Sequence, residues 1–393
     1  MRLVSGNKSD TGRTVKRSHL PCAGNRRMKE YKYLFQKLLK EETIRAAYKK
    51  MRLGKTRRAE IVAIDANLDE EVKAMQTMLA NSHEGADDPE HGFWPPKHKK
   101  KYMFERGKQR TIYMPDIKEQ WVHHCIIQVL APIVTATAYK YSCGSMPHKG
   151  AHFGKRAVRK WIDSGKGIKY FLKADIRHFY SNIHHDVLRK ELEKRIKDPW
   201  FIDLVMRCLC QFKKGIPLGF YISQWLANYL LEPLDNYIVG TEKKYMRYMD
   251  DIIIFSANKR KLRYLLESIK RILGKLRLRL KRNHQIALFI FGTRGRPLNF
   301  MGFLFHRDKT LIREKIMLRA VRLAKKINKS TRIYRTHAYA MISLMGWFLC
   351  TDTYHCYWLN IKPLIDIKRL KAIISKGDKN DRLENRDLLR ATC

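Results

Sequence analysis

Apolar residues recur at helical spacing in the first part of the chain. Their steps of three and four residues are clear over residues 31–38, and the helical pattern extends over residues 28–80. Glycines and prolines then interrupt it, so residues 81–101 are predicted to form a loop. The N-terminal part should therefore consist of packed helices followed by an irregular segment.

The pattern changes in the middle of the chain, where short β-rich runs alternate with helices. Strands are predicted at residues 169–172 and 252–255, and helices at residues 223–234 and 262–273. After residue 311 the chain becomes helical and strongly basic. This alternation is typical of an α+β fold, and 393 residues are enough for two or three packed subdomains.

Charge adds the first indication of a partner. Lys and Arg number 81 against 37 for Asp and Glu, which gives a formal net charge of +44. An excess of this size favours a polyanionic partner, with nucleic acid ahead of an anionic membrane surface. Residues 1–27 are rich in Lys and Arg and predict a flexible basic arm, and a polar tail follows from residue 377.

Hydropathy and cysteine usage exclude several other classes. No apolar run approaches the roughly 18 to 20 residues that span a bilayer, so no membrane partner is expected. The eight cysteines are scattered and form no Cys-x-x-Cys pair, which argues against a zinc finger or a disulfide framework. We therefore expect a cytoplasmic protein.

Three aspartates adjoin apolar segments, and a carboxylate has little structural reason to follow an apolar strand, as Asp175 does. Asp250 and Asp251 lie between two apolar segments, as at the tip of a β-hairpin, and Asp175 follows an apolar strand. Converging carboxylates are hard oxygen ligands that suit a pair of Mg²⁺ ions in nucleotidyl transfer. An Asp-Asp pair by itself can also be an ordinary turn or helix cap.

The order of several motifs supports the metal interpretation. Over roughly residues 105–375 the chain resembles reverse transcriptases in five segments that follow the order of that family's motifs. These segments are Asp175-Ile-Arg-His-Phe-Tyr-Ser-Asn-Ile, Gly215-Ile-Pro-Leu-Gly-Phe-Tyr-Ile-Ser-Gln-Trp-Leu-Ala-Asn, Arg247-Tyr-Met-Asp-Asp, Leu278-Arg-Leu-Lys-Arg-Asn-His-Gln-Ile and Leu298-Asn-Phe-Met-Gly-Phe.

The resemblance implies a right-hand polymerase fold of class α+β, with a basic helical N-terminal extension. The expected parts are the flexible arm at 1–27, the RNA-binding helical extension at 28–104, fingers at 105–174, a palm with an antiparallel sheet at 175–305, a helical thumb at 306–376 and the polar tail at 377–393.

The resemblance also implies roles for individual residues. Two Mg²⁺ ions would be bound by Asp175, Ile176, Asp250 and Asp251, of which the three aspartates are catalytic. The nucleotide would contact Arg110, Lys149, Tyr180, Leu218, Gly219 and Gln224. Template and primer would contact Ser223, Asn228, Tyr248, Met249, Met301 and Gly302. The ring of Tyr180 is expected to clash with a ribose 2′-hydroxyl and so favour deoxynucleotides.

The general acid is left open by a departure from the family pattern. Reverse transcriptases usually carry a Lys near the position aligned with His284, and Lys281 lies three residues earlier. His can act as a general acid at neutral pH. Either His284 or Lys281 is therefore a candidate.

The segment Leu218 to Gln224 indicates a particular kind of reverse transcriptase. It resembles the enzymes of bacterial or phage diversity-generating retroelements, which carry an aliphatic residue before the Gly and Ser-Gln at the end. Replacement of the usual Gln by Leu218 removes polar contacts near the nucleotide, so error-prone copying is expected, with ordinary fidelity in a repacked pocket as the alternative. The implied partners are a cognate structured noncoding RNA, a DNA or RNA primer, the cDNA product, dNTPs and a small basic accessory protein.

Other hypotheses remain open at this point. A defence-associated reverse transcriptase, whose cDNA acts against phage, would have the same catalytic residues. A catalytically idle RNA-binding scaffold is a further alternative, which the three aspartates disfavour. Primer choice, homo-oligomerisation and the need for an accessory protein are not determined by the sequence.

Overall fold

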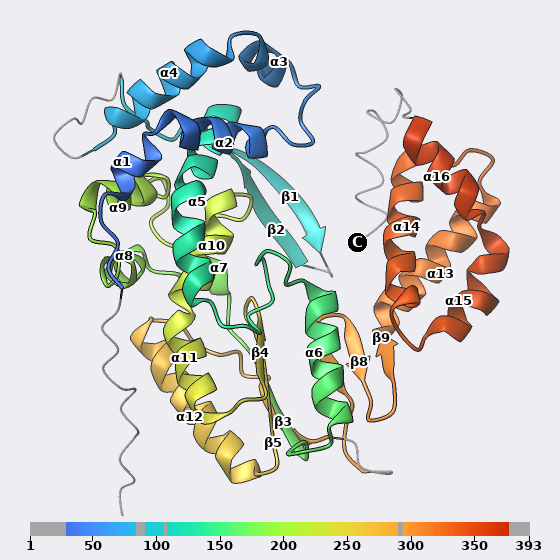
Figure 1. Ribbon diagram of the computed structural model, residues 1–393. Helices are drawn as coiled ribbons and strands as arrows, with labels where there is room; N and C mark the ends of the chain where they lie inside the picture. Colours follow the sequence, from blue (N-terminus) through green and yellow to red (C-terminus); the bar gives the residue numbers. More distant parts are fainter. Residues whose placement is uncertain (1–28, 84–90, 106–107, 290–293, 377–393) are drawn as a thin grey trace, which may run out of the picture.

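The computed structural model describes residues 29–83, 91–105, 108–289 and 294–376, and its helices and strands are shown in Figure 1. The predicted basic arm and polar tail lie outside the described residues. Helices and antiparallel sheets alternate along the chain, so the predicted α+β class is confirmed.

The N-terminal helices share the hydrophobic core of the long helix α5 (Ile117–Thr137), on which the first two of them pack. They are α1 (Leu34–Leu38), α2 (Glu41–Met51), α3 (Ala59–Ala66) and α4 (Leu68–Ala80), as the helical spacing over residues 28–80 predicted. Helix α5 begins after Asp116, whose side chain accepts a hydrogen bond from the Glu119 N–H. The N-terminal helices are therefore part of the main body of the protein.

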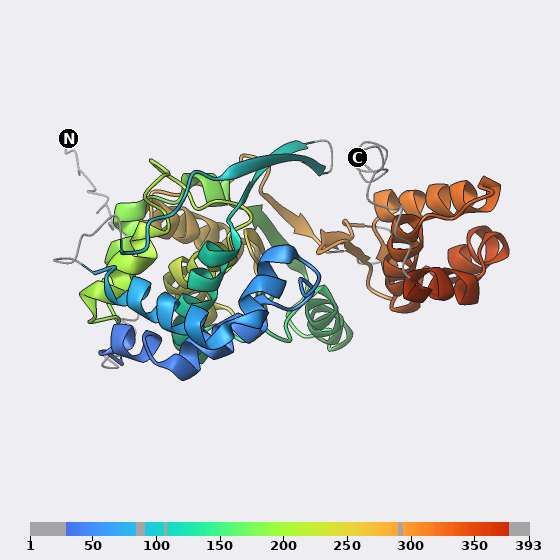
Figure 2. The same ribbon diagram turned by 90° about the horizontal axis from the view of Figure 1, so that it is seen from above.

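A β-hairpin projects from this body (Figure 2). It consists of β1 (Lys99–Glu105) and β2 (Lys108–Met114), paired antiparallel. The predicted loop at residues 81–101 is thus wrong at its end, because β1 already begins at Lys99. The hairpin is mostly exposed, so the apolar periodicity that marks a buried strand is weak in β1.

A four-stranded antiparallel sheet lies at the centre, in the order β4-β5-β3-β6. Its strands are β4 (Tyr245–Tyr248), β5 (Asp251–Ser256), β3 (Tyr170–Asp175) and β6 (Gln285–Leu288). The predicted strands at 169–172 and 252–255 correspond to β3 and β5.

The sheet is covered on both faces, because alternate side chains of a strand point to opposite sides. Ile252 and Ile254 of β5 belong to the large core, which also receives α12 (Lys259–Lys275). Ile253 and Phe255 belong to a second core, which receives α6 (Ala151–Asp163).

The predicted helix at 223–234 is two helices in the structure. Helix α10 (Tyr221–Leu230) is followed by its capping residue Leu231, and α11 (Glu232–Thr241) begins directly after it. Pro233 explains the break, because proline has no N–H to continue the hydrogen-bond ladder but is tolerated in the first turn of a new helix. The short helices α7 (Phe179–Asn182), α8 (His185–Glu193) and α9 (Pro199–Arg207) lie between β3 and α10 in the chain.

The C-terminal part is a separate helical bundle reached through a small sheet (Figures 1 and 2). The sheet has the order β7 (Leu298–Phe300), β8 (Phe303–Phe305) and β9 (Thr310–Ile312). The bundle contains α13 (Glu314–Lys329), α14 (Arg335–Leu349), α15 (Tyr354–Asn360), a 3₁₀ turn (Lys362–Leu364) and α16 (Ile367–Lys376), around a third core. Within the described residues, no helix has the length and apolar character needed to cross a bilayer.

Two of the predicted domain boundaries fall inside structural elements. The boundary after residue 104 lies within the β1–β2 hairpin, and the boundary after residue 174 lies within β3. The sheet is formed by residues far apart in the sequence, so a boundary placed at a motif does not coincide with a boundary in the fold.

Candidate active site

The three aspartates come together at one end of the central sheet. Asp175, the last residue of β3, lies directly opposite Asp251, the first residue of β5. Asp250 lies in the two-residue turn between β4 and β5, as Tyr248 pairs with Asp251 across that hairpin. The Ile176 N–H donates to the Asp250 carbonyl oxygen at 3.2 Å and joins this turn to the end of β3. The predicted hairpin is confirmed, with Asp250 in its turn.

A buried arginine holds the turn in place. Arg247 donates through Nε and Nη2 to the two carboxylate oxygens of Asp235 on α11, at 2.8 and 2.6 Å. Its Nη1 donates to the Met249 carbonyl oxygen at 3.1 Å and to Asn228 Oδ1 at 3.0 Å. Met249 has a positive φ of 56°, which is uncommon for a residue with a side chain. The guanidinium therefore ties a strained turn to two helices.

Burial and mutual repulsion both disfavour negative charge on the carboxylates. Burial, followed by the charges of Asp175 and Asp251, raises the pKa of Asp250 to about 6. Burial and the charge of Asp175 also raise the pKa of Asp251, against the opposing charges of Lys173, Lys281 and Arg313. A bound cation would relieve this repulsion.

The residues fit a divalent metal, although the side chains are not already arranged around one. Within the part of the chain that the structure describes, no group of three or more His, Cys, Asp or Glu side chains is placed to hold a metal ion. Lys281 Nζ instead contacts Asp175 Oδ2 at 2.5 Å, and Asp175 Oδ1 is buried without a hydrogen-bond partner. Three carboxylates with an unsatisfied buried oxygen form a donor set suited to a hard ion such as Mg²⁺.

The two general-acid candidates differ in their contacts. The side-chain ammonium of Lys281 contacts the Asp175 carboxylate, and the main-chain N–H of Lys281 donates to the Asp175 carbonyl oxygen at 2.8 Å. The Nδ1 atom of His284 instead lies 3.0 Å from the Lys281 carbonyl oxygen. Lys281 is therefore the candidate that touches a site carboxylate.

Tyr180 lies beside this site, whereas the Leu218–Gly219 segment lies against the β1–β2 hairpin. Burial, followed by the charge of Asp250, raises the pKa of the Tyr180 hydroxyl, and the Tyr180 carbonyl oxygen accepts from the Ile216 N–H at 2.9 Å. The Leu218 carbonyl oxygen accepts from the Tyr113 N–H of β2 at 2.8 Å. Gly219 has φ +108°, and a Cβ there would clash with the Tyr113 carbonyl oxygen. This glycine permits the close approach of the motif to the hairpin.

Other predicted residues are placed less directly. Arg110 is exposed on β2 of the projecting hairpin, opposite Met103. Lys149 lies in a turn before α6, and its charge lowers the pKa of the Cys143 thiol against the larger effect of burial. The backbone N–H of Cys143 in turn donates to the Arg247 carbonyl oxygen of β4 at 2.8 Å. The fold brings Lys149 toward β4, whereas Arg110 lies on an arm.

Ser223 and Asn228 are directed into the protein. Ser223 is 1% exposed and its hydroxyl donates to the Pro217 carbonyl oxygen at 2.7 Å. Asn228 is 5% exposed and its amide donates to the Gly144 carbonyl oxygen at 3.0 Å. Both side chains therefore support the site from within, whereas Gln224 on the same helix is exposed.

Met301 and Gly302 form the turn between β7 and β8. Met301 has φ 52° and is buried against Gly154 of α6. Gly302 has φ +87° and its carbonyl oxygen accepts from the Arg313 N–H at 2.9 Å. A Cβ at Gly302 would meet the ring of Trp347 on α14. This turn therefore connects the central body with the C-terminal bundle.

Sequence reasoning missed the role of the Arg247–Asp235 pair and of Lys173. Lys173 is on β3, and its Nζ donates to the Asn299 carbonyl oxygen at 2.6 Å. The sequence contained a signal for Lys173, because it is a charged residue preceded by the apolar run Tyr170 to Leu172. It is two residues from Asp175, so the two side chains point to the same face of the strand.

Comparison with known proteins agrees with this arrangement of motifs. Protein YkfC of Escherichia coli is 24% identical over 144 residues, covering 34% of this chain and 38% of that protein. The group II intron-encoded protein LtrA of Lactococcus lactis is 23% identical over 167 residues, covering 39% of this chain and 27% of that protein. The matches thus span well under half the length of these curated relatives.

A structural comparison finds apo telomerase from Candida tropicalis, with a TM-score of 0.47 and 13% identity over 78% of this chain and 63% of that one. The profile of the family described as reverse transcriptase (RNA-dependent DNA polymerase) matches residues 96–305, just over half of the chain and all three aspartates. The chain belongs to the reverse transcriptase family.

Proposed function

We propose that this protein is an RNA-directed DNA polymerase that extends a primer by nucleotidyl transfer with two Mg²⁺ ions. The observation that carries the proposal is the strand register, which sets Asp175 opposite Asp251 and leaves Asp250 in the adjoining turn. Divalent-metal catalysis is general to the family, whereas the identity and number of the ions are part of our proposal.

The metal ligands would be the three aspartates and the main-chain carbonyl of Ile176. The Ile176 N–H points to the Asp250 carbonyl. Because the N–H and C=O of one residue in an extended strand point to the same side, the Ile176 carbonyl would face the same turn. When bound, the two ions would activate the primer 3′-hydroxyl and stabilise the leaving pyrophosphate. Lys281 would have to release Asp175 Oδ2, which would leave its ammonium close to the reacting phosphates. We therefore favour Lys281 over His284 as the general acid.

Selection of the nucleotide would depend on side chains around the same turn. Tyr180 is near Asp250, as expected of a ring that excludes a ribose 2′-hydroxyl. Leu218 and Gly219 would border the nucleotide. Lys149 would bind its phosphates, and Arg110 would join it after movement of the hairpin. Charge-assisted contacts of this kind position the triphosphate and stabilise charge in the transition state.

The parts of the structure correspond to the parts of a right hand. We assign the β1–β2 hairpin and α5 to the fingers, the central sheet to the palm and the C-terminal bundle to the thumb. Helix α13 of the thumb exposes several basic side chains to solvent, at Lys315, Arg319, Arg322, Lys325, Lys326 and Lys329. Such a face suits the phosphates of a template–primer duplex, and the basic N-terminal helices would hold a structured RNA.

We further propose a diversity-generating role, with a cognate noncoding RNA as template and error-prone synthesis of cDNA. The segment from Leu218 to Gln224 supports this, because Leu218 contributes no side-chain hydrogen bond to the nucleotide. A small basic accessory protein would be a further partner. Bacterial or phage origin and a cytoplasmic location belong to the same proposal.

Purified protein tests the polymerase proposal directly. With an RNA template, a DNA primer, dNTPs and Mg²⁺, it should extend the primer, and Asp250→Asn should abolish extension while the protein stays folded. Extension by Asp250→Asn at the native rate would contradict the metal assignment. Sequencing of the products tests the finer role: errors spread evenly over the four template bases would count against diversification and leave the polymerase proposal intact.

A further inference from the structure

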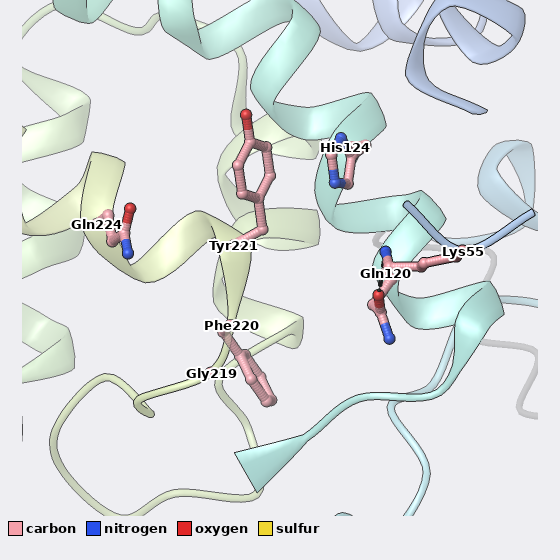
Figure 3. A pocket seen from close by; sticks show the side chains of 7 residues that line it. All are labelled: Lys55, Gln120, His124, Gly219, Phe220, Tyr221 and Gln224. Atoms are coloured by element: carbon pink, nitrogen blue, oxygen red, sulfur yellow. Dashed lines mark hydrogen bonds between the residues drawn. The ribbon is translucent and has the colours of Figure 1, made fainter. Parts of the chain in front are cut away.

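A pocket of about 270 Å³ lies on the side of α10 that bears Gln224. Figure 3 shows its walls, which come from three distant parts of the chain: Lys55 after α2, Gln120 and His124 on α5, and Tyr221 and Gln224 at the start of α10. Its volume is just below the range of pockets for drug-sized molecules, so it can take one planar group but no duplex.

The lining of the pocket combines a flat aromatic surface with unused polar groups. The rings of His124 and Tyr221 are stacked, with centroids 4.1 Å apart and an interplanar angle of 9°. Tyr221 is 37% exposed, so part of its side chain is accessible to a ligand. His124 Nδ1 is buried without a hydrogen-bond partner in the described structure. No acidic side chain lines the pocket.

Charge in this region favours an anionic ligand with a neutral ring. Lys55 Nζ donates to the Met51 carbonyl oxygen at 2.8 Å and to Gln120 Oε1 at 2.6 Å, which leaves one of its three donors for a ligand. Burial, followed by the charges of Lys55 and Lys50, lowers the pKa of His124 to about 4. The imidazole is therefore neutral at pH 7 and adds ring surface without charge.

A chain of hydrogen bonds links the pocket to the catalytic turn. The Gln224 carbonyl oxygen accepts from the Asn228 amide at 3.1 Å, one helical turn further along α10. Asn228 Oδ1 in turn accepts from Arg247, which holds the Met249 carbonyl. One helical turn and two side chains therefore join the pocket to the turn that carries Asp250.

Position and chemistry together identify the ligand class. At a site that copies a strand, the template beyond the primer end has no pairing partner. An unpaired nucleotide offers a base that can be splayed out and stacked on an aromatic ring, and a phosphate for a cation. We propose that this pocket binds the first unpaired nucleotide of the template, with its base on Tyr221 and its phosphate on Lys55. This inference rests on the proposed polymerase function.

Binding of the full-length protein to a primer–template with a chain-terminated primer tests the proposal without catalysis. Fluorescence anisotropy would compare a blunt template end with template overhangs of one and three nucleotides. Base stacking of about 1–3 kcal/mol corresponds to a gain of roughly 5- to 150-fold in affinity from the first overhanging nucleotide. Tyr221→Ala should remove most of that gain and leave the affinity for the blunt duplex unchanged, whereas Tyr221→Phe should retain it.

A matched control is Tyr264→Ala, since Tyr264 is an exposed ring on α12, which covers the central sheet. It should leave the overhang gain unchanged. An equal overhang gain in the native protein and in Tyr221→Ala would overturn the proposal, as would an equal loss of affinity for blunt and overhanging templates. An abasic first overhanging nucleotide should remove the gain in the native protein; a full gain without the base would also overturn it.

The outcomes separate this proposal from the polymerase function. An overhang gain that depends on Tyr221, in a protein that extends no primer, would support the pocket and contradict the polymerase. Primer extension without any effect of Tyr221 on overhang binding would contradict the pocket alone. Quenching of a fluorescent free dNTP at the pocket, lost in Tyr221→Ala, would assign the pocket to the nucleotide and overturn its assignment to the template.

Discussion

The buried ion pair between Arg247 and Asp235 should be essential to the stability of the catalytic turn. Their side chains are 1% and 2% exposed, with Nη2 and Oδ2 2.6 Å apart. Asp235→Asn would leave the guanidinium buried without its countercharge, and would replace the charged acceptor of the Tyr245 hydroxyl bond, which is 2.5 Å long. Removal of one partner of such a pair costs about 3–5 kcal/mol.

Urea denaturation of the native protein and the variant would measure this cost, at an unchanged slope against denaturant. Glu242→Gln is the control, because Glu242 pairs with Lys261 at 3.0 Å with side chains 16% and 38% exposed. Breaking that partly exposed pair should cost less than about 1 kcal/mol. The double variant Arg247→Met/Asp235→Leu should recover part of the loss, since apolar replacement of both partners leaves no unpaired charge, while the buried Tyr245 hydroxyl still lacks its acceptor.

The same substitution should weaken metal use. Arg247 holds the Met249 carbonyl beside Asp250, so a loosened guanidinium should raise the Mg²⁺ concentration needed for half-maximal primer extension. The recovered double variant should still require more Mg²⁺, because it lacks the donor to the Met249 carbonyl. The reasoning would be refuted if Asp235→Asn cost no more than Glu242→Gln, or if the double variant used Mg²⁺ as the native protein does.

Three further predictions concern neighbouring residues. Because the pKa of Asp250 is raised from 3.8 to about 6, the unfolding free energy of the metal-free protein should fall as pH rises between these values. Asp250→Asn should therefore stabilise the metal-free protein by up to about 3 kcal/mol at pH 7 and should have no effect at pH 3, as urea denaturation would measure. Gly219→Ala should destabilise the fold by about 1–3 kcal/mol through strain at its positive φ, whereas Gly240→Ala on α11, with open space around it, should not, as thermal unfolding would show. Tyr180→Val should raise ribonucleotide use about tenfold or more in primer extension, and Tyr180→Phe should not.

Local patterns were sufficient to predict most of the helices and strands. Apolar spacing predicted the N-terminal helices, β3, β5 and α12, because helices and strands with one buried face show it in their periodicity. An Asp pair between two apolar segments predicted the hairpin, because polar residues at a turn need no burial. Pro233 lies within the predicted helix at 223–234 and is the sequence signal for the break between α10 and α11.

The sequence by itself singled out the residues of the proposed site: three aspartates, a ring at Tyr180 and a glycine at Gly219. Only the tertiary structure decided how they are held. The opposition of Asp175 and Asp251 depends on strand pairing across 76 residues, and Arg247 pairs with Asp235 through the packing of α11 against β4. The pocket of Lys55, His124 and Tyr221 joins three segments that no local pattern relates. Periodicity reports whether a side chain is buried; it carries no information about which partner meets it there, because that partner is set by long-range packing.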